Sequence, residues 1–177
     1  MKKNVDAFDY AGHICKAMKK GILLTTKAGE QVNTMTIGWG KIGIEWNKPV
    51  FIAYVRETRF TKEMLERNGE FTVNIPYGEF DSSILGYCGK RSGRDTDKIR
   101  DLGLSLVDSE LVAVPGIRQL PLTLECRVIY KQKQNLTVLS KEINERFYPK
   151  LDESGFQDYH IAYYGEIVNA YLIQAEN

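Results

Sequence analysis

The residues with the clearest chemical potential lie where an apolar run ends, in the segment Arg56-Glu57-Thr58-Arg59-Phe60-Thr61. Two guanidinium groups, two hydroxyl groups and the free N–H groups of a helix start would suit a phosphate dianion, because each donor is charged or dipole-assisted. The alternative is an ordinary helix start, capped by Thr58 or Thr61, with the arginines in solvent. From residue types alone, the ordinary helix start is the simpler interpretation.

A second segment, Asn33-Thr34-Met35-Thr36-Ile37-Gly38-Trp39, combines amide, hydroxyl, sulfur and aromatic groups. On a strand, Asn33, Met35, Ile37 and Trp39 share one face, and the two threonines share the other. Such a strand could present a ring-binding surface and polar donors to a flat heteroaromatic ligand. It is equally consistent with Met35 and Ile37 in the core and Trp39 as a packing residue.

A third segment, Cys88 to Lys98, contains small residues and clustered cations: CGKRSGRDTDK. It predicts a loop that approaches a ligand closely and closes on its anionic edge. The alternative is an exposed basic loop that ends in a helix capped by Asp95. We interpret Cys88 as a small buried residue rather than a redox thiol, because it has no cysteine partner nearby.

Two familiar nucleotide motifs are excluded by their context. Gly38, Gly40 and Gly43 match the dinucleotide fingerprint literally, but Pro49 follows where a helix would have to continue. We therefore expect these glycines to lie in a strand and a bend. The stretch from Gly86 to Gly93 lacks the upstream glycine and the hydroxyl residue of a P-loop.

Composition narrows the class of protein. At 177 residues, the chain predicts a single domain spanning 1–177. The 24 basic and 23 acidic residues leave no long-range field for a nucleic acid or a membrane, and neither is expected as a partner. Three separated cysteines, two isolated histidines and a polar N-terminal segment predict a cytoplasmic protein with no disulfide framework and no metal site.

The apolar patterns predict a mainly β fold with short helices. Phe8, Ala11, Cys15 and Met18 recur at helical spacing before Gly21, which predicts a first helix with these residues on its apolar face. Strands are predicted over 22–26, 32–39, 50–56, 71–75, 122–130 and 161–173, and short helices over 61–68, 82–87, 96–102 and 141–148. The absence of regular strand-helix alternation favours a closed antiparallel sheet, a barrel with Greek-key-like connections.

Read in order, the segments NTMTIGWG, KPVFIAYVRETRFT, GEFTVNIP, GYCGKRSGRDTDK and YGEIV resemble the flavin reductase-like family, including flavoredoxins. The resemblance covers nearly the whole chain, and it is weakest over 132–156, which we treat as an insertion. It implies an FMN-binding split β-barrel that acts as a homodimer.

The resemblance also implies which residues bind flavin mononucleotide (FMN). The ring and ribityl chain would contact Asn33, Thr34, Met35, Thr36 and Trp39, and the phosphate would contact Arg56, Thr58, Arg59, Phe60 and Thr61. The third segment would close the site with Cys88, Gly89, Ser92 and Lys98, and Lys98 would face the negative charge of reduced flavin. Tyr163 or Tyr164 would reach the flavin of the second subunit.

The chemistry would then belong to the flavin, and no catalytic acid, base or nucleophile is predicted in the chain. The expected function is an NAD(P)H-dependent flavin reductase. The alternative is a flavoredoxin-like electron carrier that a protein partner reduces.

Overall fold

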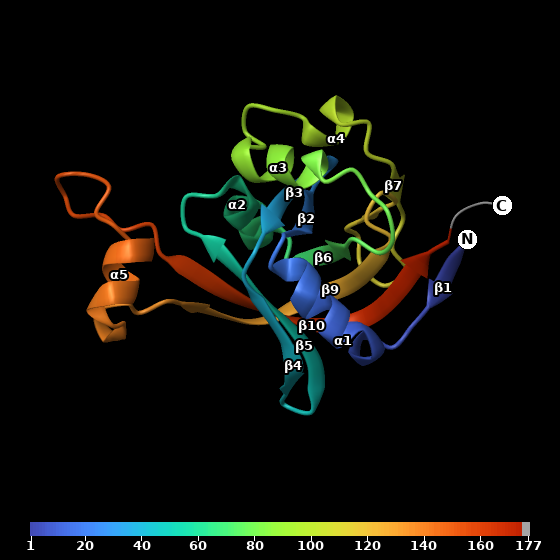
Figure 1. The fold of residues 1–177 in the computed structure, drawn as a ribbon, viewed down its shortest axis with the longest axis horizontal. Helices are drawn as coiled ribbons and strands as arrows, with labels where there is room; N and C mark the ends of the chain where they lie inside the picture. Colours follow the sequence, from blue (N-terminus) through green and yellow to red (C-terminus); the bar gives the residue numbers. More distant parts are fainter. Residues whose placement is uncertain (175–177) are drawn as a thin grey trace.

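The computed structural model describes residues 1–174, and in these residues an antiparallel sheet of eight strands forms the body of the molecule (Figure 1). The strand order is β3-β2-β6-β9-β10-β5-β4, with β1 beside β10. The strands are β1 (Lys2–Asn4), β2 (Ile22–Ala28), β3 (Gln31–Ile37), β4 (Gly40–Glu45), β5 (Lys48–Arg56), β6 (Glu70–Ile75), β9 (Leu122–Lys133) and β10 (His160–Ile173). Two short strands, β7 (Leu106–Val107) and β8 (Gly116–Ile117), pair separately.

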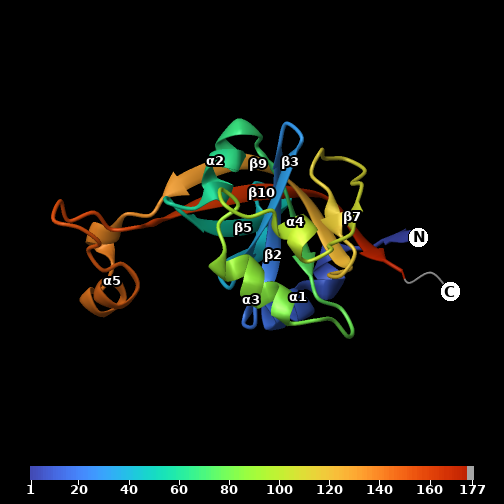
Figure 2. The ribbon, with the colours of Figure 1, turned by 90° about the horizontal axis from the view of Figure 1, so that it is seen from above.

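Short helices connect and cover the strands, as Figure 2 shows from above. The α-helices are α1 (Ala11–Met18), α2 (Phe60–Arg67), α3 (Ser83–Lys90), α4 (Lys98–Asp101) and α5 (Lys141–Phe147), and the 3-10 helices are η1 (Ala7–Tyr10) and η2 (Leu136–Val138). A mainly β antiparallel fold with short helices, as predicted, is confirmed.

The core lies between the curved faces of the sheet and α1. Aliphatic and aromatic side chains from β2, β5, β6, β9 and β10 are fully buried there, which provides the main driving force for folding. Gly165 on β10 allows a close approach in this core, because an added Cβ would lie 2.4 Å from the Phe71 ring. The register of β10 on β9 shifts immediately before this glycine, so the sheet bends where the aromatic ring packs.

The insertion predicted over 132–156 forms an arm at the ends of β9 and β10. Figure 1 shows α5 and the following loop standing away from the sheet. The base of the arm returns to the body through Arg56, whose guanidinium donates to the carbonyl oxygens of Phe147 (3.1 Å) and Asp158 (2.7 Å). The arm is therefore anchored to the C-terminal end of β5.

The hairpin between β4 and β5 turns through Trp46 and Asn47. Both residues have positive φ angles, 51° and 57°, as a two-residue hairpin turn of the primed type requires. The expected strand and bend around Gly38, Gly40 and Gly43 are thus confirmed, and Gly40 and Gly43 lie within β4.

Several predicted details are wrong for local reasons. The buried face of α1 carries Ile14 and Met18, one helical turn apart, whereas Cys15 lies one residue beyond Ile14 and is exposed, and Phe8 is exposed in η1. Strand β3 ends at Ile37, so Trp39 lies beyond it.

The third segment also differs from the prediction. Helix α3 continues to Lys90, so Cys88 and Gly89 lie in a helix rather than in a loop. Asp97, not Asp95, caps α4 by accepting from the Arg100 N–H (3.1 Å). Within residues 1–174, no helix is long and apolar enough to cross a membrane.

Candidate functional site

A groove of three adjoining cavities runs along the C-terminal ends of β3 and β5. The inner cavity, about 110 Å³, lies between β3, the start of α2, the end of α3 and the loop 91–94. The middle cavity, about 190 Å³, lies between residues 35–39, β5 and His160. The outer cavity, about 440 Å³, lies between α1, residues 38–40, Tyr54 and Gln134. Neighbouring cavities share lining residues, so the three adjoin one another along the groove.

One buried hydrogen bond fixes the shape of the inner cavity. The Asn33 side-chain amide on β3 donates to the Thr61 hydroxyl in the first turn of α2 (3.0 Å), and both residues are buried. Gly93 packs against the same amide, and an added Cβ there would lie 2.2 Å from Asn33 Oδ1 and 2.8 Å from the Phe60 ring. Strand β3, the start of α2 and the loop 91–94 are therefore tightly packed at this point.

Arg59 lines the inner cavity with a guanidinium that is available for binding. It is the N-cap residue of α2, it makes no side-chain cap, and its exposed guanidinium has no partner among residues 1–174. Its side chain also lines the middle cavity. An unpaired guanidinium beside an uncapped helix start is a strong binding position for an anion.

The neighbouring donors at this corner already have partners. Thr58 donates both its N–H (3.1 Å) and its hydroxyl (2.8 Å) to the carboxylate of Asp158, at the base of the arm. Arg56 is held by the two carbonyl oxygens described above. Acceptors in the arm and at its base therefore bind Arg56 and Thr58, which the sequence assigned to a phosphate.

Lys98 lines the inner cavity beside the C-terminal end of α3. Its ammonium group donates to the carbonyl oxygens of Arg91 (3.2 Å) and Cys88 (3.4 Å), at the C-terminal end of α3. Burial lowers the pKa of Lys98, and the nearby Arg59 lowers it further. Burial raises the pKa of Cys88 to about 11, so its thiol stays protonated and unreactive near neutral pH.

Aromatic rings form the walls of the middle cavity. The ring centroid of Trp39 lies 5.0 Å from that of His160 and 5.2 Å from that of Phe147 on the arm. Tyr54 lies edge-on to His160 at 6.4 Å. The antiparallel register pairs His160 with Arg56, which brings the start of β10 to the same end of the sheet as the end of β5.

His160 is neutral in this setting. It is 7% exposed, and burial lowers its pKa to about 4, with a further contribution from the positive charge of Arg56. Tyr148 donates its single hydroxyl proton to Gln134 (2.6 Å), so the His160 Nδ1–H donates to the Tyr148 oxygen (2.8 Å). The Nε2 atom of His160 is therefore a hydrogen-bond acceptor.

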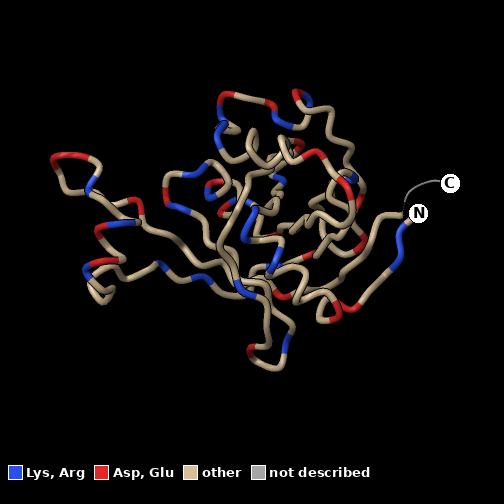
Figure 3. The backbone as a smooth tube through the Cα atoms, in the orientation of Figure 1, with Lys and Arg blue, Asp and Glu red and all other residues tan. Residues whose placement is uncertain are grey.

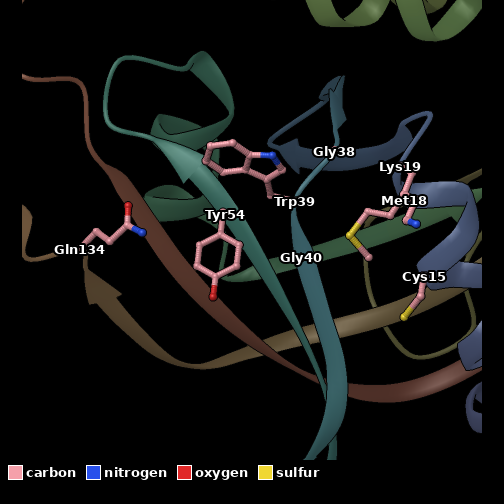
Figure 4. A pocket seen from close by; sticks show the side chains of 8 residues that line it. All are labelled: Cys15, Met18, Lys19, Gly38, Trp39, Gly40, Tyr54 and Gln134. Atoms are coloured by element: carbon pink, nitrogen blue, oxygen red, sulfur yellow. The ribbon is translucent and has the colours of Figure 1, made fainter. Parts of the chain in front are cut away.

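The outer cavity is the open end of the groove. In Figure 4, Cys15 and Met18 of α1 and the following Lys19 lie on one side, Trp39 and Tyr54 lie in the centre, and Gln134 lies on the opposite side. The walls are mostly apolar and aromatic with a few polar groups at the rim, which is the usual composition of a small-molecule site.

Comparison with known proteins assigns the chain to a family. The family model described as "Flavin reductase like domain" matches residues 17–177. The chain belongs to the flavin reductase-like family. An uncharacterized protein of Archaeoglobus fulgidus is 31% identical over 100 residues, which cover 56% of this chain and 55% of that protein. The chain spans between 55% and 64% of the length of the curated relatives it matches.

Solved structures of the flavin reductase-like fold superpose on the chain. A flavoredoxin from Methanosarcina acetivorans has a TM-score of 0.64 at 25% identity, covering 87% of this chain and 68% of that one. An FMN-binding domain of a flavin reductase-like enzyme from Shewanella baltica has a TM-score of 0.62 at 16% identity, covering 97% and 77%. The predicted split-barrel fold of this family is confirmed.

Most residues that the sequence predicted for the flavin reductase-like site come together in the groove. All of them except Thr34, Trp39 and Arg56 line the inner cavity, and Trp39 and Arg56 line the middle cavity. Thr34 lines none of the three, because its fully buried hydroxyl bonds to Thr25 (3.0 Å) and to the Leu24 carbonyl oxygen (3.3 Å).

Two tyrosines were candidates to reach the flavin of a second subunit, and the prediction for Tyr163 is wrong. Tyr163 is 1% exposed, and its hydroxyl donates to Glu66 (2.8 Å) within the same chain. Tyr164 lies instead among surface aromatic residues.

Sequence reasoning missed Tyr54, His160 and the outer cavity. Tyr54 could have been found, because it lies two residues before Arg56 and a strand places both side chains on one face. From the sequence, His160 stands out only as a possible metal ligand without a partner at ligand spacing. Its place beside Trp39 depends on the pairing of β10 with β5, which no local pattern reveals.

The buried neutral His160 makes stability depend on pH. Between pH 6.5 and about 4, the unfolded chain holds more protons at this residue than the folded chain does, so the free energy of unfolding falls as pH falls through this window. The shift corresponds to about 3 kcal/mol. We expect His160→Gln to remove that part of the slope in urea unfolding measured from about pH 7 to about pH 4.

The other histidine of the chain supplies the matched control. His13 bonds to the Pro76 carbonyl oxygen, outside the groove, and His13→Gln is measured beside it. An undiminished acid sensitivity in His160→Gln would show that other groups cause it.

Proposed function

We propose that the groove binds FMN non-covalently, with the phosphate in the inner cavity and the isoalloxazine ring in the middle cavity. The observation that carries this proposal is the unpaired Arg59 at the uncapped start of α2, next to a cavity walled by Trp39, Tyr54 and His160. A dianion and a flat aromatic ring held on one short linker match these two surroundings. Membership of the flavin reductase-like family supports the same ligand class.

Hydrogen-bond donors close to the inner cavity, rather than the net charge of the protein, would bind the phosphate. Figure 3 shows Lys and Arg interspersed with Asp and Glu over the backbone, in keeping with a net charge of +1. Arg59 and the first N–H groups of α2 therefore supply the main attraction, and Ser92 lines the same cavity. Arg56 and Thr58 would contribute directly only if they exchanged their bonds to the arm.

When bound, FMN supplies the redox chemistry, since its ring accepts and releases a hydride. The chain holds, orients and screens it. Trp39 and Tyr54 position the ring, and the acceptor Nε2 of neutral His160 can receive a hydrogen bond from a ligand in the middle cavity. The positive charges of Arg59 and Lys98 favour an anionic group in the inner cavity.

We further propose that the protein is an NAD(P)H-dependent flavin reductase. The outer cavity, of about 440 Å³, adjoins the middle cavity along Gly38, Trp39 and Tyr54, which leaves room for a nicotinamide against one face of the ring. The second candidate is a carrier that a redox protein reduces, and the similarity to a flavoredoxin favours it. Both functions use the same FMN.

FMN binding should depend on Arg59. A charged hydrogen bond to phosphate contributes roughly 1.5 to 3 kcal/mol, so Arg59→Ala should weaken FMN binding by about ten-fold or more in a fluorescence titration. Arg67→Ala, an exposed arginine in the last turn of the same helix, should change affinity by less than about two-fold. Equal losses in both variants would refute the phosphate position.

Anaerobic reduction separates the reductase from the carrier. A reductase should lose its yellow flavin absorbance with NADH or NADPH at rates on the order of 1 to 1000 per second. Cys15→Trp should slow this reaction by filling the outer cavity, while Lys16→Trp, its neighbour outside the cavity, should not. Slow bleaching by both nicotinamides with immediate bleaching by dithionite would favour the carrier.

We also propose that the protein is a homodimer. Trp46, Tyr130 and Tyr164 form an aromatic cluster on the surface, with ring centroids 5.0 to 6.1 Å apart. Trp46 is 55% exposed and Tyr130 is 43% exposed. Large exposed aromatic side chains in one patch are typical of an interface between proteins.

The dimer should depend on this cluster. Light scattering should give twice the chain mass of 20.2 kDa for the native protein. The double variant Trp46→Ser with Tyr130→Ser should shift it toward one chain mass, because it removes the apolar rings. Leu111→Ser, an exposed apolar residue elsewhere, is the control. A native protein of single mass at all concentrations would exclude the dimer.

A further inference from the structure

Asp158, at the base of the arm, lies against a residue of the inner cavity. Its carboxylate accepts the Thr58 N–H at Oδ1 (3.1 Å) and the Thr58 hydroxyl at Oδ2 (2.8 Å). Thr58 lines the inner cavity immediately before Arg59 and the first turn of α2. A negative charge of the chain itself therefore lies one hydrogen bond away from a residue that lines the proposed phosphate position.

The backbone holds this carboxylate in place. Strand β10 pairs with β5 so that His160 lies opposite Arg56, and the same antiparallel register, continued by two residues, brings Asp158 opposite Thr58. The Asp158 carbonyl oxygen accepts from Arg56 (2.7 Å), and the next carbonyl oxygen, of Tyr159, accepts a backbone N–H of the same corner (3.0 Å). Because these two bonds hold the base of the arm, the Asp158 side chain can leave Thr58 without moving the arm.

The Thr58 donors can bind only one anion at a time. A carboxylate and a phosphate accept the same kinds of hydrogen bond, and a proton given to one is not free for the other. Thr58 has one backbone N–H and one hydroxyl proton, and both are given to Asp158. The half-buried carboxylate also repels a dianion in the adjoining cavity. Asp158 therefore opposes phosphate binding in two ways.

We infer that Asp158 is an internal competitor of the ligand phosphate. In the free protein its carboxylate occupies the Thr58 donors, and a phosphate that enters the inner cavity takes them over as the Asp158 side chain turns away. The residue thereby lowers the affinity for a phosphorylated flavin and shortens its retention, without acting on the ring. This inference rests on the proposed FMN site, and it adds a residue that limits binding there.

The experiment compares FMN with riboflavin, which has the same ring and ribityl chain but no phosphate. The ratio of the two dissociation constants, riboflavin over FMN, isolates the contribution of the phosphate. Fluorescence titration gives this ratio for the native protein, Asp158→Asn and Asp158→Ala. Asparagine removes the charge and keeps an acceptor for the Thr58 N–H, whereas alanine removes both. Glu153→Gln, which removes a charge from an exposed loop of the same arm, is the control.

Both Asp158 variants should raise the ratio by about five-fold or more, because a like charge beside the phosphate is removed. Their affinity for riboflavin should stay within about two-fold of the native value, and FMN should dissociate from them more slowly. Glu153→Gln should leave the ratio unchanged. Urea unfolding identifies a variant that does not fold, in which case the other variant decides.

The sign of the change separates this inference from a purely structural role. A lower ratio in the Asp158 variants would show that Asp158 holds Thr58 in place for the phosphate, and an unchanged ratio would show no competition. Either result, with FMN binding to the native protein intact, overturns the inference alone. Failure of the native protein and of both Asp158 variants to bind FMN would instead overturn the proposed function itself.

Discussion

The hydrogen bond from the Asn33 amide to the Thr61 hydroxyl is the constraint on which the groove depends. It joins β3, which supplies one wall, to the first turn of α2, which supplies the anion-binding position at Arg59. Both partners are buried, so losing one would leave the other unsatisfied at a cost of about 1 to 3 kcal/mol. Gly93 packs on the same amide, and this single contact therefore positions strand, helix and loop together.

Short-range patterns predicted the parts of the site that lie close together in sequence. The strand ending at Arg56 and the helix beginning at Phe60 follow from local preferences, and the corner between them was found as a candidate anion site. The same patterns failed for Thr34, which shares the opposite face of β3 with Thr36 yet bonds inside the sheet. Alternation along a strand gives the face of a residue, but not what packs against it.

The remaining parts of the site depend on pairing between distant segments. His160 lies beside Trp39 because β10 pairs with β5, and these strands are about one hundred residues apart in the chain. The arm is a second example, since Asp158 takes the Thr58 hydroxyl that the sequence assigned to a phosphate. The type of a residue predicts the chemistry of its side chain, but the sequence around it does not predict which distant residue becomes its partner.

The arm that leaves the sheet between β9 and β10 also limits how the chain could be shortened. Its carbonyl oxygens at Phe147 and Asp158 are the acceptors for Arg56, and its Tyr148 bonds to His160. Excising the protruding segment would therefore remove the Phe147 acceptor of Arg56 and the Tyr148 hydroxyl that bonds to His160. The protruding arm thus determines which polar groups line the middle cavity. A shortened version of this protein would have to retain the base of the arm.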